Sequence, residues 1–243
     1  FKKTAWSETI TENLLYFLWD LGLKIGHATR NINECISLSL QDQTITTSLL
    51  DARFICGDEE VAIVFEKSFR QSISKRSSND FIKIKLEERE SRHIKEGQSR
   101  YLVEPNIKNS KGGLRDLESL SWMTNFCYEA ARPSQMVKKD ILSNEEAAIF
   151  RRCENFLWHV RCQLHFLEKS SNDTINFNAQ VNMADKLGYL ERKGLKPVER
   201  FMKHYFLVAK EVGDLTRSVC HILEEKHRVS FVPISLFRKI LEL

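Results

Sequence analysis

The chain has 243 residues, of which 42% are hydrophobic and 29% charged, and its net charge is +4. These values are typical of a globular protein of one or two domains and give no sign of nucleic-acid binding. No stretch approaches the ~20 apolar residues needed to span a bilayer, and no secretory signal opens the chain. The six cysteines form no CxxC pair, so we expect cytosolic free thiols rather than disulfides or a zinc site.

The first predicted helix lies close to the start of the chain. Thr9 and Glu12 have the spacing of a capping box, and the apolar residues that follow recur on one helical face. Gly22 suits the position just after a helix, where a left-handed backbone is common. Residues 23–28 (LKIGHA) then predict a short strand, with their apolar side chains on one side.

Two more helix starts are predicted in this part of the chain. Asn31, with a glutamate three residues later, suits an N-cap, and Asp58 is a second candidate cap. The secondary structure of residues 44–56 stays open, because their β-branched start favours a strand whereas the run LLDAR suits a helix. The polar run at residues 72–80 is the predicted domain boundary.

Beyond this boundary the patterns are mainly helical. Ser143, with a glutamate three residues on, predicts the capped start of a long helix, and Pro197 suits the first position of another. A short extended piece is predicted at residues 174–177. The predicted helices cover residues 81–96, 114–130, 143–168, 180–187 and 197–224.

A glycine pair, Gly112-Gly113, lies in the most unusual segment of the chain, residues 101–116. Glycines allow positive φ and bring bare N–H groups close to a ligand, and lysine and arginine beside such a turn suit phosphate. The spacing matches neither the Walker pattern nor the dinucleotide-binding fingerprint. The alternative is a capped turn between two helices with surface charges around it.

The same segment resembles a known family. Residues 104–108 (EPNIK) followed by 112–116 (GGLRD) are similar to a signature of the bifunctional PII-protein uridylyltransferase/uridylyl-removing enzymes. Three further segments resemble the family in the same order along the chain. They are residues 14–30 (LLYFLWDLGLKIGHATR), 156–166 (FLWHVRCQLHF) and 198–206 (VERFMKHYF).

The resemblance implies a mainly α chain with three parts. Residues 1–75 would be the C-terminal part of an α/β nucleotidyltransferase domain, and residues 76–225 an all-α helical domain. Residues 226–243 would begin a linker to a further domain. The chain does not begin with Met, and the family's Gly-[Gly/Ser] turn and Asp-x-Asp pair do not occur in order here. We therefore expect a fragment of a longer enzyme, inactive by itself.

The resemblance also implies a function for the parent enzyme. Such enzymes transfer UMP from UTP to a tyrosine of the PII nitrogen-signalling protein, a reaction that needs a divalent ion such as Mg²⁺. They also remove UMP through a downstream HD domain and respond to glutamine through ACT domains. The implied partners are UTP, PII and glutamine, without nucleic acid or membrane, and the implied location is the cytoplasm.

Site residues follow from the resemblance and from their chemistry. Asp51, flanked by apolar residues, is the predicted third carboxylate, which binds metal or acts as the catalytic base; the alternative is a surface aspartate paired with Arg53. Arg30 is a predicted triphosphate contact, since arginine binds phosphate through two parallel bonds. The other predicted nucleotide-binding residues are Glu104, Asn106, Lys108, Lys111, Gly112, Gly113, Arg115 and Asp116.

Within this set the cations would contact phosphate. Glu104 and Asp116 would orient them or bind ribose or base, and Asn106 would read the uracil edge. Two other functions stay open. One is a related adenylyltransferase-type enzyme, which the EPNIK and GGLRD motifs disfavour. The other is a non-catalytic helical docking module.

Overall fold

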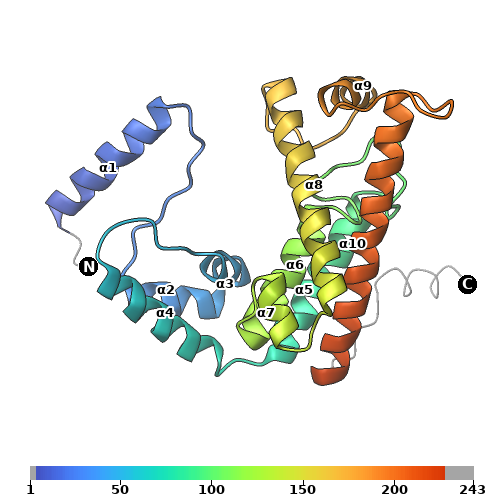
Figure 1. Ribbon diagram of the computed structural model, residues 1–243. Coiled ribbons are helices and arrows are strands. Elements are labelled where there is room, and N and C mark those ends of the chain that lie inside the picture. Colours follow the sequence, from blue (N-terminus) through green and yellow to red (C-terminus); the bar gives the residue numbers. More distant parts are fainter. Residues whose placement is uncertain (1–3, 228–243) are drawn as a thin grey trace, which may run out of the picture. The chain divides into compact units, whose positions relative to one another are not determined.

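The computed structural model describes residues 4–227. The chain divides into two compact units, Phe1–Arg76 and Ser77–Leu243. All regular elements of the described residues are α-helices, apart from two isolated β-bridges (Figure 1). The mainly α fold class is therefore confirmed. No helix within residues 4–227 is long and apolar enough to cross a membrane.

The first unit contains four helices within its described residues. They are α1 (Ala5–Asp20), α2 (Ile32–Gln41), α3 (Gln43–Leu50) and α4 (Glu59–Ile73). Asn31 caps α2 and Asp58 caps α4, both as predicted. α2 packs on α3 and α4. The Arg76 guanidinium joins α2 to α3, since it donates to the Ser39 carbonyl at 3.1 Å and to Thr46 Oγ1 at 3.0 Å.

The structure corrects two predictions in the first unit. α1 begins at Ala5 rather than near Thr9, because Thr4 is the N-cap and exchanges hydrogen bonds of 3.0 and 3.2 Å with Ser7. Thr9 lies inside the helix, where its hydroxyl donates to the Ala5 carbonyl at 2.9 Å. The predicted strand at residues 23–28 is wrong. These residues are irregular, and residues 4–76 contain no partner strand that could satisfy an isolated β segment.

The ambiguous stretch at residues 44–56 is resolved. It contains most of α3 and then an irregular segment that leads to the start of α4. Gly22 takes φ +77 just after α1, as predicted. The described part of this unit contains only helices and irregular segments, so its assignment to an α/β nucleotidyltransferase domain stays a prediction.

The second unit is a helical bundle in which α8 and α10 lie side by side (Figure 1). Its helices are α5 (Ser78–Lys95), α6 (Leu114–Tyr128), α7 (Pro133–Lys138), α8 (Asn144–Glu168), α9 (Phe177–Lys186) and α10 (Pro197–His227). α10 contacts α5, α6, α8 and α9, and so passes through the middle of the core. Phe150, Phe201 and Tyr205 are among its largest fully buried side chains.

Most predictions for the second unit agree with the structure. Ser143 and Glu146 form the predicted capping box, and Pro197 is the first residue of α10. α7 was not predicted, because six residues are too few to show helical periodicity. Of the predicted linker at residues 226–243, the first two residues continue α10 and the rest lies outside the described residues.

Candidate functional site

The motif segment between α5 and α6 folds into a compact loop. Asn106 Oδ1 accepts the backbone N–H groups of Lys108 at 3.1 Å and Asn109 at 2.8 Å, while Ser110 Oγ accepts the N–H of Asn106 at 2.9 Å. Ile107 is fully buried beneath the loop. The asparagine in EPN thus builds the loop, because its side-chain oxygen replaces a backbone acceptor for two successive N–H groups.

The loop is fixed to the segment between α8 and α9. The Ile107 N–H donates to the Asp173 carbonyl at 2.8 Å, and the Ile175 N–H donates to the Pro105 carbonyl at 2.9 Å. Glu104 Oε1 accepts the backbone N–H of Phe177 at 2.9 Å, at the start of α9. Thr174 and Ile175 of the predicted extended piece therefore pair with the motif loop, whereas Phe177 already begins α9.

Both glycines of the motif are required by close packing. Gly112 has φ +85, and a Cβ there would lie 2.8 Å from Ala209 Cα on α10 and would overlap the Ala209 carbonyl oxygen. Gly113 has a φ open to any residue, but a Cβ there would lie 2.7 Å from the Ile107 carbonyl oxygen. Backbone thus occupies the space where a side chain would begin, so these contacts explain the glycines without a ligand.

Asp116 is fully buried at the start of α6. Its carboxylate lies 2.9 Å from His93 Nε2, forms an ion pair with Arg92, and accepts the Gly112 N–H at 2.8 Å. Arg89 Nε lies 3.4 Å from Asp116 Oδ1, the oxygen that also contacts Arg92 and His93. Burial alone would raise the pKa of Asp116, but the His93 hydrogen bond and the arginine charges hold it well below its usual range.

The three partners of Asp116 on α5 were not predicted from the sequence. Arg89, Arg92 and His93 are spaced to lie on one face of that helix, and α5 was predicted only as a charged helix. The available signal was the high density of charged residues on α5. Because this helix packs on both α6 and α10, some of its charged side chains become buried, and each buried charge needs a partner.

The three predicted loop cations have different surroundings. Arg115 forms an ion pair with Glu118 at 2.9 Å and lies over the Trp122 ring at 5.3 Å. Lys111 is half-buried; burial lowers its pKa, and the charges of neighbouring arginines lower it further. Lys108 is also half-buried, within the turn that Asn106 organises. The loop therefore holds two lysines and an arginine close to a backbone turn.

Arg161 and His165 lie one turn apart on the same face of α8, and both contact Asp173. Arg161 Nε lies 2.7 Å and His165 Nε2 2.8 Å from the same carboxylate oxygen. Because the Asp173 carbonyl also holds Ile107, this cluster connects α8 to the motif loop. Because the cluster of Arg161, His165 and Asp173 joins two parts of the bundle, we interpret it as structural.

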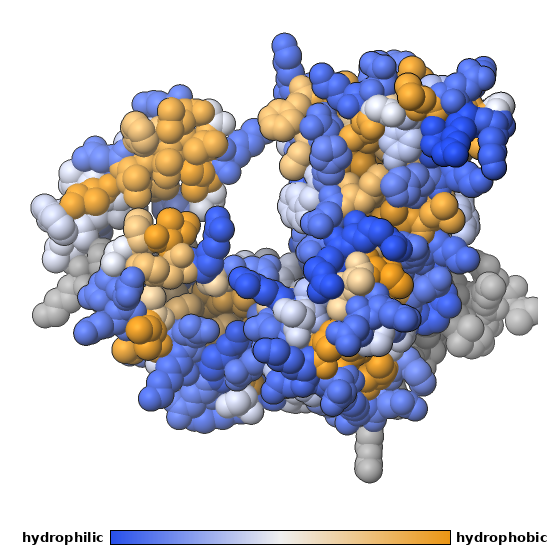
Figure 2. Space-filling model, in the orientation of Figure 1, coloured by the Kyte–Doolittle hydropathy of each residue, from blue (hydrophilic) through white to orange (hydrophobic). Residues whose placement is uncertain are grey.

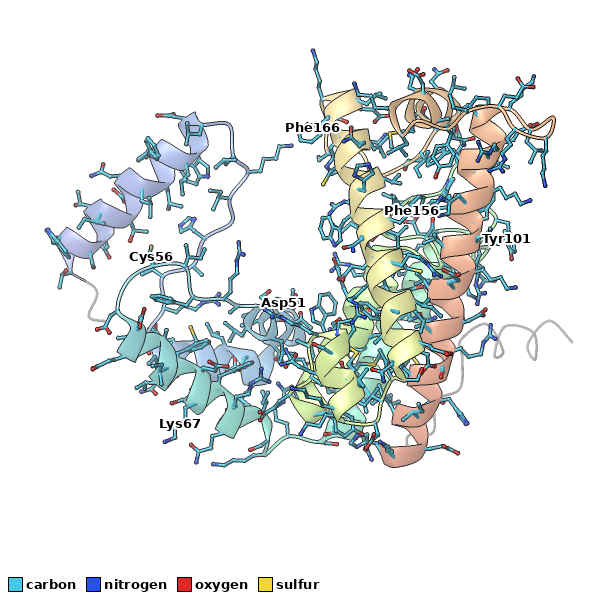
Figure 3. The ribbon with its side chains drawn as sticks, viewed as in Figure 1. Asp51, Cys56, Lys67, Tyr101, Phe156 and Phe166 are labelled. Carbon is cyan, nitrogen blue, oxygen red and sulfur yellow. The ribbon has the colours of Figure 1, made fainter. Side chains whose placement is uncertain are left out.

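Arg30 and Asp51 belong to the first unit. Arg30 is half-buried just before α2 and lines a cavity of about 400 Å³ that includes Phe54 and Phe65. Asp51 is exposed and lies where α3 ends (Figure 3). Within the described residues, no group of three His, Cys, Asp or Glu side chains could hold a metal ion. The catalytic and metal-binding roles of Asp51 stay predictions.

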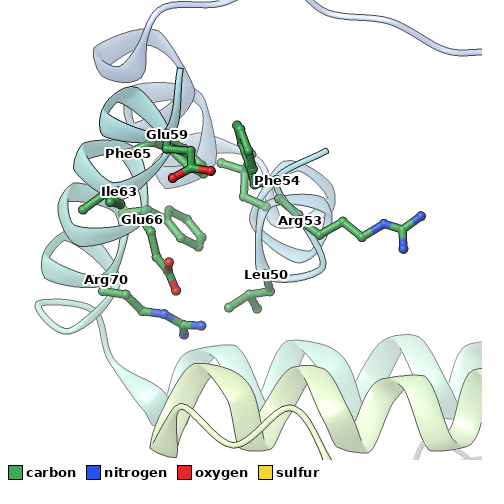
Figure 4. A pocket seen from close by; sticks show the side chains of 12 residues that line it. Leu50, Arg53, Phe54, Glu59, Ile63, Phe65, Glu66 and Arg70 are labelled. Atoms are coloured by element: carbon green, nitrogen blue, oxygen red, sulfur yellow. The ribbon is translucent and has the colours of Figure 1, made fainter. Parts of the chain in front are cut away.

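A second cavity of the first unit, of about 470 Å³, lies between α3 and α4 (Figure 4). Leu50, Ile63, Phe65 and Phe54 give it apolar walls, and acidic and basic side chains of α4 stand at its edge. The residues on both sides of Asp51 line this cavity, while Asp51 itself does not. The carboxylate is thus placed beside the cavity rather than in its wall.

Comparisons with known proteins place the chain in a family. A curated relative named "Bifunctional uridylyltransferase/uridylyl-removing enzyme", from Rhodopseudomonas palustris, is 46% identical over 226 residues. A family model described as GlnD PII-uridylyltransferase matches residues 80–220. The chain belongs to this family. It spans 24% of the length of that relative, which in turn matches 93% of this chain. No solved structure matches it significantly.

Proposed function

We propose that this chain is part of an enzyme that transfers UMP from UTP to a tyrosine of the PII signalling protein. The observation that carries the proposal is the 46% identity to a uridylyltransferase over 93% of the chain. The family model covers the motif loop and the bundle around it. Both comparisons favour uridylyl transfer over the adenylyl transfer considered as an alternative.

In the proposed reaction, the tyrosine oxygen attacks the α-phosphorus of UTP. The bond from that phosphorus to the oxygen bridging to the β-phosphate breaks, and pyrophosphate leaves. The tyrosine proton passes to a base, and Asp51 is our candidate for that role. We also propose Mg²⁺ as the ion that neutralises the triphosphate. Residues 4–227 contain no group of three His, Cys, Asp or Glu side chains that could hold a metal ion.

The motif loop is the proposed contact for the phosphates. The proposed phosphate-binding residues are Arg30, Lys108, Lys111 and Arg115. Gly112, Gly113 and Asp116 would act by holding the loop, since their packing and hydrogen bonds fix its backbone. Asn106 and Glu104 would contact base and ribose through Nδ2 and Oε2, because Oδ1 and Oε1 bind backbone N–H groups.

The test is UMP transfer by the full-length gene product, with labelled UTP and purified PII. We expect Lys108→Gln and Lys111→Gln each to raise the KM for UTP about tenfold, the usual effect of removing one charged hydrogen bond. Lys138→Gln, an exposed residue of α7, is the matched control and should leave KM unchanged. Wild-type kinetics in both loop variants would remove the loop from the nucleotide site.

Regulation and location belong to the same proposal. The relative is named as both a transferring and a removing enzyme. We propose that the whole protein likewise removes UMP from PII, under the control of glutamine. We also propose a cytoplasmic location.

A further inference from the structure

The connection between α9 and α10 contains a tight hairpin turn that the proposed function does not use. Lys193 and Gly194 both have positive φ, +54 and +75. Arg192 and Leu195 exchange backbone hydrogen bonds of 3.2 and 3.1 Å across the turn. Two consecutive residues with positive φ are the mark of a type I′ turn, which fixes the directions of its flanking side chains.

Three contacts fix this connection to the first turns of α10. Arg200 donates a hydrogen bond to the Leu190 carbonyl. Tyr189 Oη lies 2.6 Å from His204 Nδ1, and the Tyr189 ring packs edge-on against Phe201 with centroids 5.6 Å apart. Phe201 is fully buried, so the connection is anchored to the core of the second unit.

A cavity of about 490 Å³ lies between the turn and α10. This volume is within the range of small-molecule sites. Four cationic side chains line it, from Arg192 and Lys193 on the turn and from Arg200 and Lys203 on α10, beside Tyr189, His204 and two leucines. Among the residues that the structure describes, no Asp or Glu lines this cavity. In Figure 2 strongly hydrophilic residues gather where α10 begins.

The cavity is separate from the motif loop. Ala209, which the loop contacts, is fully buried, whereas Lys203, His204 and Leu207 are exposed residues of the same helix. At about 100° per residue, these three positions lie on the side of α10 opposite to Ala209. A ligand in the cavity would therefore not contact the proposed nucleotide-binding loop.

We propose that this cavity is a second binding site, for a small molecule that carries clustered phosphate groups. Four like charges held around one concave surface repel one another, and a multiply charged anion would relieve this repulsion. Arginine and lysine together suit phosphate, because the guanidinium binds two oxygens at once and the ammonium acts as a point charge. The Tyr189 ring and the leucines offer an apolar wall to the rest of the molecule.

The test is calorimetric titration of the chain with inorganic pyrophosphate at about 150 mM salt, where long-range charge attraction is screened. In the Lys108→Gln background, which weakens the proposed phosphate contact of the motif loop, we expect saturable binding at this cavity. Arg192→Gln and Lys203→Gln should each weaken it about tenfold, as for the loss of one charge-assisted hydrogen bond. Lys210→Gln is the matched control, with the same charge change on an exposed residue of the same helix, and should change binding less than twofold.

Three outcomes would overturn the proposal. One is the absence of binding by the wild-type chain at 1 mM pyrophosphate. Another is a loss of pyrophosphate affinity in Lys210→Gln equal to that in Arg192→Gln and Lys203→Gln, which would indicate attraction to the overall positive charge of α10. The third is binding of a poly-glutamate peptide without binding of pyrophosphate, which would assign the cavity to an acidic protein segment. Unchanged thermal midpoints of the variants would show that each one folds.

Discussion

Asp116 is the residue on which the geometry of the motif loop depends. It joins α5 to the loop, because one carboxylate binds His93 and Arg92 on the helix and the Gly112 N–H on the turn. A buried carboxylate that faces the guanidinium groups of Arg89 and Arg92 cannot be removed without leaving their charges uncompensated. The GGLRD motif therefore has a structural basis that is independent of any ligand.

The pH dependence of stability tests this role. The pKa of Asp116 is lower in the folded chain than the ordinary value of 3.8. Its contribution to stability is therefore fully present above about pH 3.8 and is lost as the pH falls further, since the unfolded state then binds the proton more readily. We expect Asp116→Asn to lose about 3 to 5 kcal/mol at pH 7. Urea unfolding between pH 7 and pH 3 would measure both effects.

The control for this experiment is Asp185→Asn, on the exposed side of α9. It should unfold like the wild type at every pH. The acid-induced loss of stability should be smaller in Asp116→Asn than in the wild type. A parallel decline in all three proteins would show that other carboxylates, such as Asp173, whose pKa is also lowered in the folded chain, account for it.

Gly112 allows a second prediction from a single residue. Gly112→Ala places a methyl group against the backbone of Ala209 and also forces alanine into a left-handed conformation. Gly188→Ala is a matched comparison, since Gly188 has φ +71 and no atom within 4 Å of the added Cβ. We expect Gly188→Ala to lower the free energy of unfolding by about 1 kcal/mol, through backbone strain alone. Gly112→Ala should lower it by about 1 to 3 kcal/mol more, because the methyl group overpacks the contact with Ala209.

Chemical denaturation at neutral pH would measure the difference between the two glycine variants. If Gly112→Ala were no less stable than Gly188→Ala, the loop would have room to move away from α10. In that case the close contact would not explain the glycine pair, and a role in ligand binding would gain support.

At the scale of elements, three of the four predicted capping residues were correct, and Thr9 was the exception. Asn31, Asp58 and Ser143 were each expected to begin a helix, and each does so. A cap depends on a side chain and a backbone N–H two or three residues away, so its signal is entirely local. The strand predicted at residues 23–28 was wrong because a strand also needs a partner, which a local pattern cannot supply.

Helix α1 buries few of its residues. Ile10, Leu14 and Phe17 are exposed on one face of the helix, and the exposed Leu21 continues this face at the C-cap. Only Ser7 and Leu15 are buried among its residues. Apolar residues also gather over this helix in Figure 2. A continuous apolar stripe on a helix is a surface to which hydrophobic dyes bind.

We therefore expect the chain to enhance the fluorescence of the dye ANS under native conditions. The double variant Leu14→Gln and Phe17→Gln should lower this enhancement, because it interrupts the stripe at its centre. Asn13→Gln, at an exposed neighbouring position, should leave it unchanged. An undiminished signal in the double variant would mean that the dye binds elsewhere, for example in the cavity between α3 and α4.

At the scale of the whole molecule, the sequence predicted the positions of elements better than the relations between them. The mainly α class and the long helices α8 and α10 follow from periodicity and caps. The network around Asp116 and the cavity beside Lys203 each combine residues from separate elements. Such combinations depend on tertiary packing, which spacing along one helix does not determine.

The distribution of burial predicts how stability varies along the chain. α10 packs on four other helices, and Val208, Val212 and Thr216 along it are at most 2% exposed. Amides in such a helix exchange only through large-scale unfolding, whereas a helix with few buried residues opens locally. Native-state hydrogen exchange measured by mass spectrometry should thus find the slowest amides in the centre of α10 and much faster exchange in α1. Equal protection in the two helices would show that α1 is held by contacts beyond Ser7 and Leu15.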